Sequence, residues 1–194
     1  MLAYENGVSV MQNRKFKLAL FAAALGCSLS AGVVPASASP QHVRAVRPLS
    51  TPQWGTIENW NSGKCLEDHG YESGNGATVD QWTCGSGSNG QWEFVSAGSI
   101  YYHIINKYTG LCLEVPGAST TEGAAVDQWT CGSGTNGLWD QEDSIGGGGY
   151  MFANAQTDFV LEVAGSSTAN GAEVDVYGRN YTDTQFWAAP SWQS

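Results

Sequence analysis

The chain has 194 residues, of which 18 are acidic and 8 are basic, so its formal net charge is −10 at pH 7. A chain this acidic is repelled by phosphate backbones and anionic lipid surfaces, which argues against nucleic acid and membranes as partners. Only 13% of the residues are charged, whereas Gly is abundant (25 residues) and Trp (8) is as frequent as Tyr (8). Such a composition is typical of short strands joined by many turns.

The first segment predicts a secretory signal peptide rather than folded structure. Basic residues at positions 14, 15 and 17 precede the apolar run 18–29, and small residues follow as far as Ala38. This order of positive charge, apolar run and Ala-x-Ala site is the pattern of a cleaved leader. The apolar run is too short for a membrane span. We therefore assign residues 1–38 to the signal peptide, with Met11 as an alternative start, and expect a secreted, extracellular protein.

Cys27 leaves a lipidated N-terminus open as an alternative, although Ala24 and Leu25 are poor residues for the positions before a lipidated Cys. The next segment, 39–53, contains three prolines and no apolar pattern, which predicts a flexible linker. Residues 54–194 then remain for a single domain.

Two segments of eight residues, Asp80–Gly87 and Asp127–Gly134, are identical and lie 47 positions apart, which marks an internal repeat. The same offset relates Ile57 to Ile104, Asn59 to Asn106, Gly63 to Gly110, Cys65 to Cys112, Leu66 to Leu113, Glu67 to Glu114 and Trp92 to Trp139. A further step of 48 positions reaches Phe152, Asn154, Leu161, Glu162, Asp175, Tyr177 and Trp187. Three repeats, at about 54–98, 99–146 and 147–194, therefore make up the domain.

The repeats contain strand-sized pieces, such as 101–105, 112–115 and 125–129, separated by Gly, Asn, Ser and Thr. Four short strands fit in each repeat, which gives twelve in all. A closed body with pseudo-threefold symmetry buries three equivalent apolar faces without leaving sheet edges open. The sequence therefore predicts an all-β fold.

With Gly63–Glu67 (Gly-Lys-Cys-Leu-Glu), Gln81-Trp82 and the later Trp92, the chain resembles the ricin-type (ricin B-like) lectin domain, a β-trefoil, in three registers. That family's signature is Gln-x-Trp near the end of each repeat. Only the third repeat keeps it, at 185–187, because Gly90 and Gly137 replace the Gln in the first two. The resemblance implies that Trp92, Trp139 and Trp187 are core residues, so the fold prediction survives this change.

The resemblance also implies carbohydrate binding at up to three pockets, one in each repeat. Each pocket combines a carboxylate, an aromatic ring, the residue at the Asn position before the last Trp, and an Asp. These residues are Glu67, Trp82, Asn89 and Asp80 in the first repeat, Glu114, Trp129, Asn136 and Asp127 in the second, and Glu162, Tyr177, Thr184 and Asp175 in the third.

The residues themselves suit a sugar ligand. If Val79 faces the core, strand alternation places Asp80 and Trp82 together on the outer face. A pyranose needs a flat apolar platform for its C–H face and polar groups for its hydroxyls, and an aromatic ring beside a carboxylate and an amide supplies both. Every repeat has Glu where the family usually has Asp. The longer side chain either shifts the preferred sugar or weakens binding, or the pockets are built around Glu.

Cys65 and Cys84 are 19 positions apart within one repeat, and so are Cys112 and Cys131. Since cysteines of exported proteins pair by default, we predict two local disulfides, each stabilising by about 3 kcal/mol. The repeats contain neither Cys-x-x-Cys nor clustered His, so we expect no metal and no cofactor. The third repeat has Val160 and Arg179 instead, and is expected to depend on packing alone. With Tyr177 for Trp and Thr184 for Asn, we expect it to bind sugar more weakly or not at all.

Two other functions compete with sugar binding. Glu67 and Asp80 resemble the carboxylate pair of a glycoside hydrolase, but three near-copies of one constellation do not suit a single catalytic pocket, so we do not expect an enzyme. His42, His69 and His103 have no nucleophile partner, although His69 lies beside the first pocket. A degenerate trefoil that acts as an inhibitor or protein-interaction module is the second alternative. In either case we expect a monomer.

Overall fold

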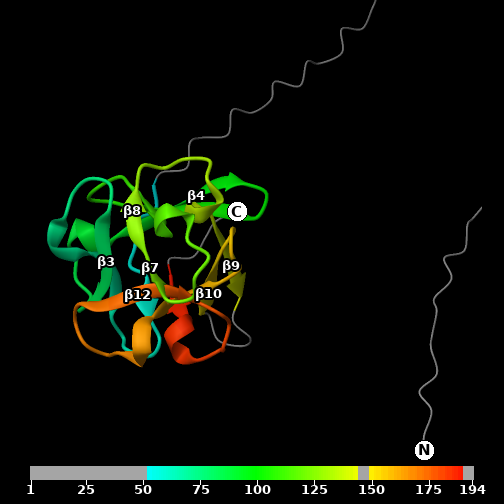
Figure 1. Cartoon of the computed structure of the whole chain (residues 1–194). Coiled ribbons are helices and arrows are strands. Elements are labelled where there is room, and N and C mark those ends of the chain that lie inside the picture. The colour runs from blue at the N-terminus through cyan, green and yellow to red at the C-terminus, as the bar shows by residue number, and fades with distance from the viewer. Residues whose placement is uncertain (1–51, 144–148, 190–194) are drawn as a thin grey trace, which may run out of the picture. The chain divides into compact units, whose positions relative to one another are not determined.

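The computed structural model describes residues 52–143 and 149–189. The predicted leader and most of the predicted linker lie outside the described residues. In the described part, none of the helices has the length and apolar character needed to cross a membrane. This part consists of short antiparallel strands and three-residue 3-10 turns, and Figure 1 shows them wrapped into one body.

The strands follow the repeats in the order that the sequence predicts. The first repeat contains β1 (Glu58–Asn59), β2 (Cys65–Asp68), β3 (Ala77–Trp82) and β4 (Trp92–Gly98). The second contains β5 (Tyr101–Asn106), β6 (Cys112–Glu114), β7 (Ala124–Ala125), β8 (Asp127–Trp129) and β9 (Trp139–Asp143). The third contains β10 (Tyr150–Asn154), β11 (Val160–Val163), β12 (Ala172–Tyr177) and β13 (Trp187–Ala188).

The described residues therefore form thirteen strands rather than the predicted twelve. The difference lies at Val126, which separates β7 from β8, whereas the equivalent strands β3 and β12 are continuous. The backbone N–H of Val126 still donates to the carbonyl of Val174 at 3.0 Å, so the interruption does not break the pairing with the third repeat.

Short 3-10 turns join the strands at equivalent places in the three repeats. After the second strand of each repeat come η1 (His69–Tyr71), η3 (Pro116–Ala118) and η5 (Ala164–Ser166). Before the last strand come η2 (Ser88–Gly90), η4 (Thr135–Gly137) and η6 (Asp183–Gln185). The second group of turns carries the residues that precede each buried Trp.

The outer strands of the repeats close into a barrel. Antiparallel pairing runs from β4 to β5, β9, β10, β13 and β1 in turn. The ring closes at Gly55 and Trp92, whose backbones exchange hydrogen bonds of 3.0 and 2.8 Å. Closure leaves none of these strands as a free edge, which removes a template for aggregation.

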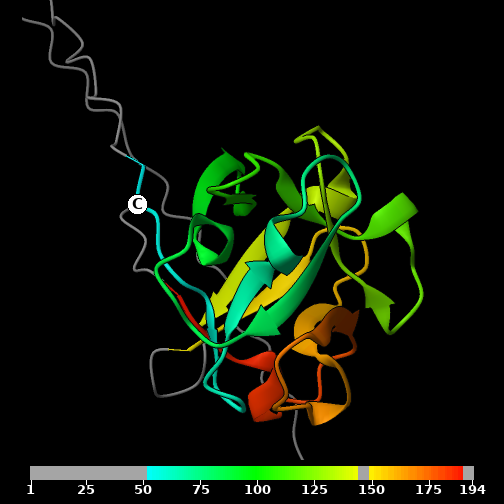
Figure 2. The ribbon, with the colours of Figure 1, turned by 90° about the vertical axis from the view of Figure 1, so that its left-hand side faces the viewer.

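The three inner hairpins, β2–β3, β6–β8 and β11–β12, join one another through their second strands. β3 pairs with β8, β12 pairs with β7, and β12 also pairs with β3, so these strands meet in one region (Figure 1). Figure 2 shows most of the third repeat, in orange and red, on one side of the body. The predicted all-β trefoil is therefore confirmed.

The core centres on three tryptophans. Trp92, Trp139 and Trp187 are at most 1% exposed and pack with aliphatic residues from every repeat. A buried indole N–H needs an acceptor. In each repeat it donates to the carbonyl of the buried leucine of the second strand, at 2.8 Å to Leu66, 2.9 Å to Leu113 and 3.0 Å to Leu161.

The two predicted disulfides, Cys65–Cys84 and Cys112–Cys131, are confirmed. The expectation that the third repeat depends on packing alone is wrong, because Arg179 forms an ionic link at the position of the second cysteine. Its guanidinium donates to the Asp158 carboxylate at 2.6 and 2.8 Å and to Glu142 at 2.5 and 3.2 Å. Glu142 belongs to the second repeat, so this contact also joins two repeats.

Replacing Arg179 by Ala should lower the free energy of unfolding by about 1–2 kcal/mol, since a bidentate charge network is lost. Arg179→Lys should recover only part of this loss, because an ammonium cannot bridge both carboxylates with a planar fork. Urea denaturation of the three proteins measures the effect. Equal midpoints for Arg179→Ala and the unsubstituted protein would contradict it.

Candidate functional site

The register of the inner hairpins brings two carboxylates together in every repeat. Residues directly opposite each other on antiparallel strands are the closest side-chain neighbours in a sheet. The opposed pairs are Glu67 with Asp80, Glu114 with Asp127, and Glu162 with Asp175. We call them, with the aromatic residue two positions after each Asp, the first, second and third sites.

The aromatic side chains of the three sites are open to solvent. Trp82 is 42% exposed, Trp129 45% and Tyr177 40%. On the opposite face of β3, by contrast, Val79 and Gln81 are buried in the interior. Asp80 shares the face of Trp82 but is only 3% exposed. The strand therefore presents a broad aromatic surface with a carboxylate recessed beside it.

An asparagine holds the glutamate in each of the first two sites. Nδ2 of Asn89 donates to Oε2 of Glu67 at 3.3 Å and to the carbonyl of Asp68 at 3.0 Å. Nδ2 of Asn136 makes the same pair of contacts, at 3.0 Å to Glu114 and 3.0 Å to the carbonyl of Val115. Each Asn thus fixes both the carboxylate and the backbone that follows it.

The third site obtains this amide from a different residue. Gln185, which is fully buried, donates from Nε2 to Oε2 of Glu162 at 2.7 Å. Thr184, at the position equivalent to Asn89, instead hydrogen-bonds through its hydroxyl to Thr182 at 2.7 Å. In the third site, the residue that holds the glutamate is therefore Gln185 and not the expected Thr184. The intact Gln-x-Trp signature was the signal that pointed to this residue.

Glycine at the Gln position leaves room for the asparagines. A Cβ placed on Gly90 would lie 3.8 Å from the Cβ of Glu67, and one on Gly137 would lie 3.7 Å from that of Glu114. A longer side chain there would extend against the glutamate, as Gln185 does in the third repeat. The first two repeats have Asn followed by Gly, and the third has Thr followed by Gln. Both combinations place one side-chain amide against the equivalent glutamate.

A buried asparagine from the following repeat supports each of these turns. Nδ2 of Asn106 donates to the carbonyl of Asn89 at 2.7 Å, and Nδ2 of Asn154 donates to that of Asn136 at 2.8 Å. In the same way, Asn59 of the first repeat donates to the carbonyl of Thr184 at 2.8 Å. Each site therefore depends on two repeats.

His69 distinguishes the first site from the other two. Its Nδ1 lies 2.7 Å from Oδ2 of Asp80, and the Asp80 carboxylate raises the pKa of the imidazole. The equivalent residues are Pro116 and Ala164, which cannot make this contact. The first site thus has a partner for its recessed carboxylate that the others lack.

Burial and mutual repulsion make the carboxylate pairs weak acids. Burial, with a smaller contribution from Asp80, raises the pKa of Glu67 to about 7. Burial and the facing glutamate raise the pKa of Asp127 to about 6 and that of Asp175 to about 7. These pairs therefore change protonation near neutral pH.

Each site also has a buried carboxylate oxygen without a hydrogen-bond partner among the described residues. These oxygens are the Oδ1 atoms of Asp80, Asp127 and Asp175. A buried acceptor without a donor is costly, which favours the protonated form of these carboxyls and agrees with their raised pKa values.

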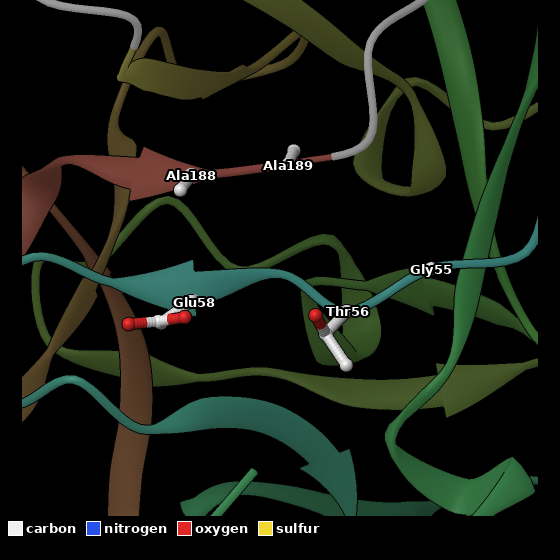
Figure 3. A pocket seen from close by; sticks show the side chains of 5 residues that line it. All are labelled: Gly55, Thr56, Glu58, Ala188 and Ala189. Atoms are coloured by element: carbon white, nitrogen blue, oxygen red, sulfur yellow. The ribbon is translucent and has the colours of Figure 1, made fainter. Parts of the chain in front are cut away.

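Outside the three sites, the described residues form a hollow without an aromatic lining but no metal site. A hollow lined by Gly55, Thr56, Glu58, Ala188 and Ala189 lies between the strands near β1 and β13 and has no aromatic residue in its lining (Figure 3). Within residues 52–143 and 149–189, no group of three or more His, Cys, Asp or Glu side chains is arranged to hold a metal ion.

Comparison with known proteins identifies the family. The model of the family described as ricin-type beta-trefoil lectin domain-like matches residues 46–129 and 89–177. The chain belongs to this family. No curated protein matches the chain.

Solved structures place this ricin-type domain among trefoils of natural and designed origin. The designed threefold symmetric protein ThreeFoil is 32% identical, with 70% of this chain and 96% of that chain covered and a TM-score of 0.68. The exo-beta-1,3-galactanase 1,3Gal43A from Clostridium thermocellum is 29% identical, with 71% of this chain but only 30% of that chain covered and a TM-score of 0.66. The Macrolepiota procera ricin B-like lectin in complex with lactose is 18% identical, with 73% and 97% covered and a TM-score of 0.60, and shows the fold alone.

Asp68 is a buried carboxylate that sequence reasoning missed. It stands where the other repeats have the core residues Val115 and Val163, and it is fully buried. Its Oδ1 accepts from Nε2 of Gln128 at 2.7 Å, whereas its Oδ2 has no partner among the described residues. Burial raises the pKa of Asp68 to about 6. Because the folded-state pKa is raised, this group favours folding at low pH, and its contribution is lost as pH rises through 6.

Asp68→Asn removes this titration while keeping an acceptor for Gln128. Between pH 4 and pH 8, the free energy of unfolding should fall by about 2 kcal/mol more in the unsubstituted protein than in Asp68→Asn. Urea denaturation at both pH values measures the difference, and all other titrating groups are common to the two proteins. Parallel pH profiles would show that Asp68 does not titrate in this range.

Proposed function

We propose that the domain is a secreted, non-catalytic lectin module that binds polysaccharide or glycan through several equivalent sites. The observation that carries this proposal is the repeated combination of an exposed aromatic ring with a recessed carboxylate pair and an amide that holds the glutamate. A sugar ring has an apolar face and a rim of hydroxyls, and this combination offers a counterpart to both.

In the proposed complex, a pyranose stacks on Trp82, Trp129 or Tyr177. Its hydroxyls donate to the Glu carboxylate and to the Asp carboxylate beside it, in charge-assisted hydrogen bonds. The amide contact from Asn89, Asn136 or Gln185 keeps the glutamate in one rotamer, so less conformational entropy is lost on binding. The polar groups therefore select orientation, and the ring supplies contact area.

The sites are not expected to contribute equally. Glu162 is 8% exposed and lies against Gln185, while Glu67 and Glu114 are more accessible. Tyr177 also offers a smaller platform than a Trp. We therefore keep the expectation that the third site binds more weakly than the other two.

Shallow sites of this kind favour a polymeric ligand. A single monosaccharide contact gives a Kd near the millimolar level, or about −4 kcal/mol. Several sites that engage one polymer can raise the avidity by roughly 10²- to 10⁴-fold when their spacing matches. The similarity to part of a galactanase supports a polysaccharide ligand without naming the sugar.

Neither competing function has comparable support. The same Glu–Asp pair occurs three times, whereas hydrolysis needs one pocket with two differently tuned acids. A role in binding or inhibiting a protein remains the alternative, and the experiment below separates it from sugar binding.

The ring platforms can be removed one at a time. Trp82→Ala and Trp129→Ala should each weaken retention on the polysaccharide that binds the intact domain by about tenfold, since one avidity contact is lost. Both should stay folded because the rings are exposed. Trp60→Ala is the matched control, because Trp60 is 41% exposed but lies outside the three sites.

A glycan array and a panel of insoluble polysaccharides identify the ligand, and circular dichroism checks the fold. Absence of binding to every glycan, together with capture of a purified protein partner, would replace the lectin proposal by the alternative. Unfolding of Trp82→Ala would show that this ring belongs to the core.

Binding should also depend on pH. Since a protonated carboxyl loses an acceptor site, affinity should be highest near pH 8. It should fall as pH drops through about 7 and 6, where Glu67, Asp175 and Asp127 take up protons. Retention on the same polysaccharide between pH 8 and pH 5 measures this, with circular dichroism at each pH. Constant retention over this range would exclude the carboxylates as ionised acceptors.

A further inference from the structure

One exposed aromatic pair breaks the threefold pattern beside the first site. Tyr71 ends the turn η1, and its counterparts in η3 and η5 are Ala118 and Ser166. All three residues have a left-handed backbone, with φ of 63°, 53° and 55°. The turn is therefore the same in each repeat, and only the first repeat carries a ring on it.

The partner of Tyr71 is also particular to this junction. Tyr108 meets it edge-to-face, with ring centroids 5.0 Å apart and an interplanar angle of 87°. At the other two junctions an amide occupies this place. Gln156 donates to the carbonyl of Ala118 at 2.6 Å, and Asn61 donates to that of Ser166 at 3.3 Å. An aromatic pair has thus replaced a polar bridge between repeats.

The pair, which we call the Tyr71–Tyr108 pair, is exposed to the same degree as the three platforms. Tyr71 is 48% and Tyr108 45% exposed, compared with 40–45% for Trp82, Trp129 and Tyr177. A polar bridge would join the repeats at this position without exposing apolar surface, as it does elsewhere in the chain. Exposed aromatic surface next to a binding site is typical of a contact surface.

The Tyr71–Tyr108 pair adjoins the first site. A Cβ placed on Gly87 would overlap both the hydroxyl of Tyr71 and Oδ1 of Asn89, so these two atoms flank the same glycine. At the equivalent Gly134, the overlap is with Asn136. The Tyr71 phenol therefore lies beside the amide that holds Glu67.

Trp82 and Tyr71 lie at opposite ends of this site. Trp82 is opposite Cys65, Asp80 is opposite Glu67, and His69 follows β2 in the direction of Tyr71. At a rise of about 3.3 Å per residue, β2 extends about 10 Å from Cys65 to Asp68, and Tyr71 lies beyond its end. This span exceeds one pyranose ring and suits two or three linked rings.

We propose that the Tyr71–Tyr108 pair forms a second subsite, where a further ring of an oligosaccharide binds when the first ring stacks on Trp82. The first site then discriminates by chain length, whereas the second site, with Ala118 and Gln156 at these places, binds a single ring. This inference rests on the proposed function.

The experiment isolates the first and second sites in the full chain. The double variant Trp129→Ala/Tyr177→Ala leaves the first site, and Trp82→Ala/Tyr177→Ala leaves the second. Each is titrated by calorimetry with galactose, xylose and mannose and with the linear disaccharides and trisaccharides of each. The measured quantity is the ratio of trisaccharide to monosaccharide affinity within the series that binds.

With the first site alone, this ratio should be about tenfold, and with the second site alone it should be near one. Adding Tyr71→Ala to the first-site variant should bring its ratio close to that of the second site. The left-handed backbone accepts this change, because Ala118 already occupies it. Tyr108→Gln introduces the residue found at the junction of the second and third repeats, and it should lower the ratio in the same way.

Tyr181→Ala is the matched control. Tyr181 is also exposed and has a left-handed backbone, but it lies in the third repeat, so this change should leave the ratio unchanged.

A ratio that survives both Tyr71→Ala and Tyr108→Gln would overturn the second subsite, and so would equal ratios for the two isolated sites. In both cases the monosaccharide still binds, so the proposed function stands. Absence of binding by every sugar to both variants and to the intact domain would refute the proposed function itself. Capture of a peptide or protein by the Tyr71–Tyr108 pair, without a sugar effect, would likewise exclude the subsite.

Discussion

In each repeat, the indole N–H of a buried tryptophan donates to the carbonyl of the leucine that precedes a site glutamate. This hydrogen bond joins the barrel to the inner hairpin. Because the leucine is fixed on both its side chain and its carbonyl, the next side chain must leave the core in a defined direction. The glutamate therefore enters its site at the same place in all three repeats. The cross-strand register then places an Asp against it, and the recessed carboxylate pair follows from the core.

The three repeats share this backbone arrangement, but different side chains make the equivalent contacts in each repeat. The amide against the glutamate comes from Asn89 or Asn136 in two repeats and from Gln185 in the third. A disulfide closes the inner hairpin twice, and Arg179 takes its place once. Such exchanges keep the backbone while changing the side-chain surface. That surface is where the sites differ in accessibility and, in our proposal, in the length of sugar that they bind.

The clustering of carboxylates also constrains the ligand. Each site already holds two acids whose pKa values are raised by burial, and in each pair one acid further raises the pKa of the other, in a chain of net charge −10. An anionic sugar would add to this repulsion, whereas neutral hydroxyls relieve it by donating hydrogen bonds. His69 reduces the repulsion at the first site alone, which sets that site apart in charge as well as in shape.

The three repeats, the all-β fold and the two disulfides could be predicted from the sequence, because each depends on short, regular spacings. Strand alternation also placed Trp82 and Asp80 on the same face of β3, whereas the burial of Asp80 depends on the fold, and the role of both toward sugar stays a proposal. The other contacts described above form only in the folded chain. The role of Gln185 and the bond from Arg179 to Glu142 depend on residues brought together from distant segments of the chain. The same holds for the burial of Asp68 beside Gln128 and for the contact of Tyr71 with Tyr108. No local spacing encodes these contacts, because closing the barrel is what makes the partners neighbours.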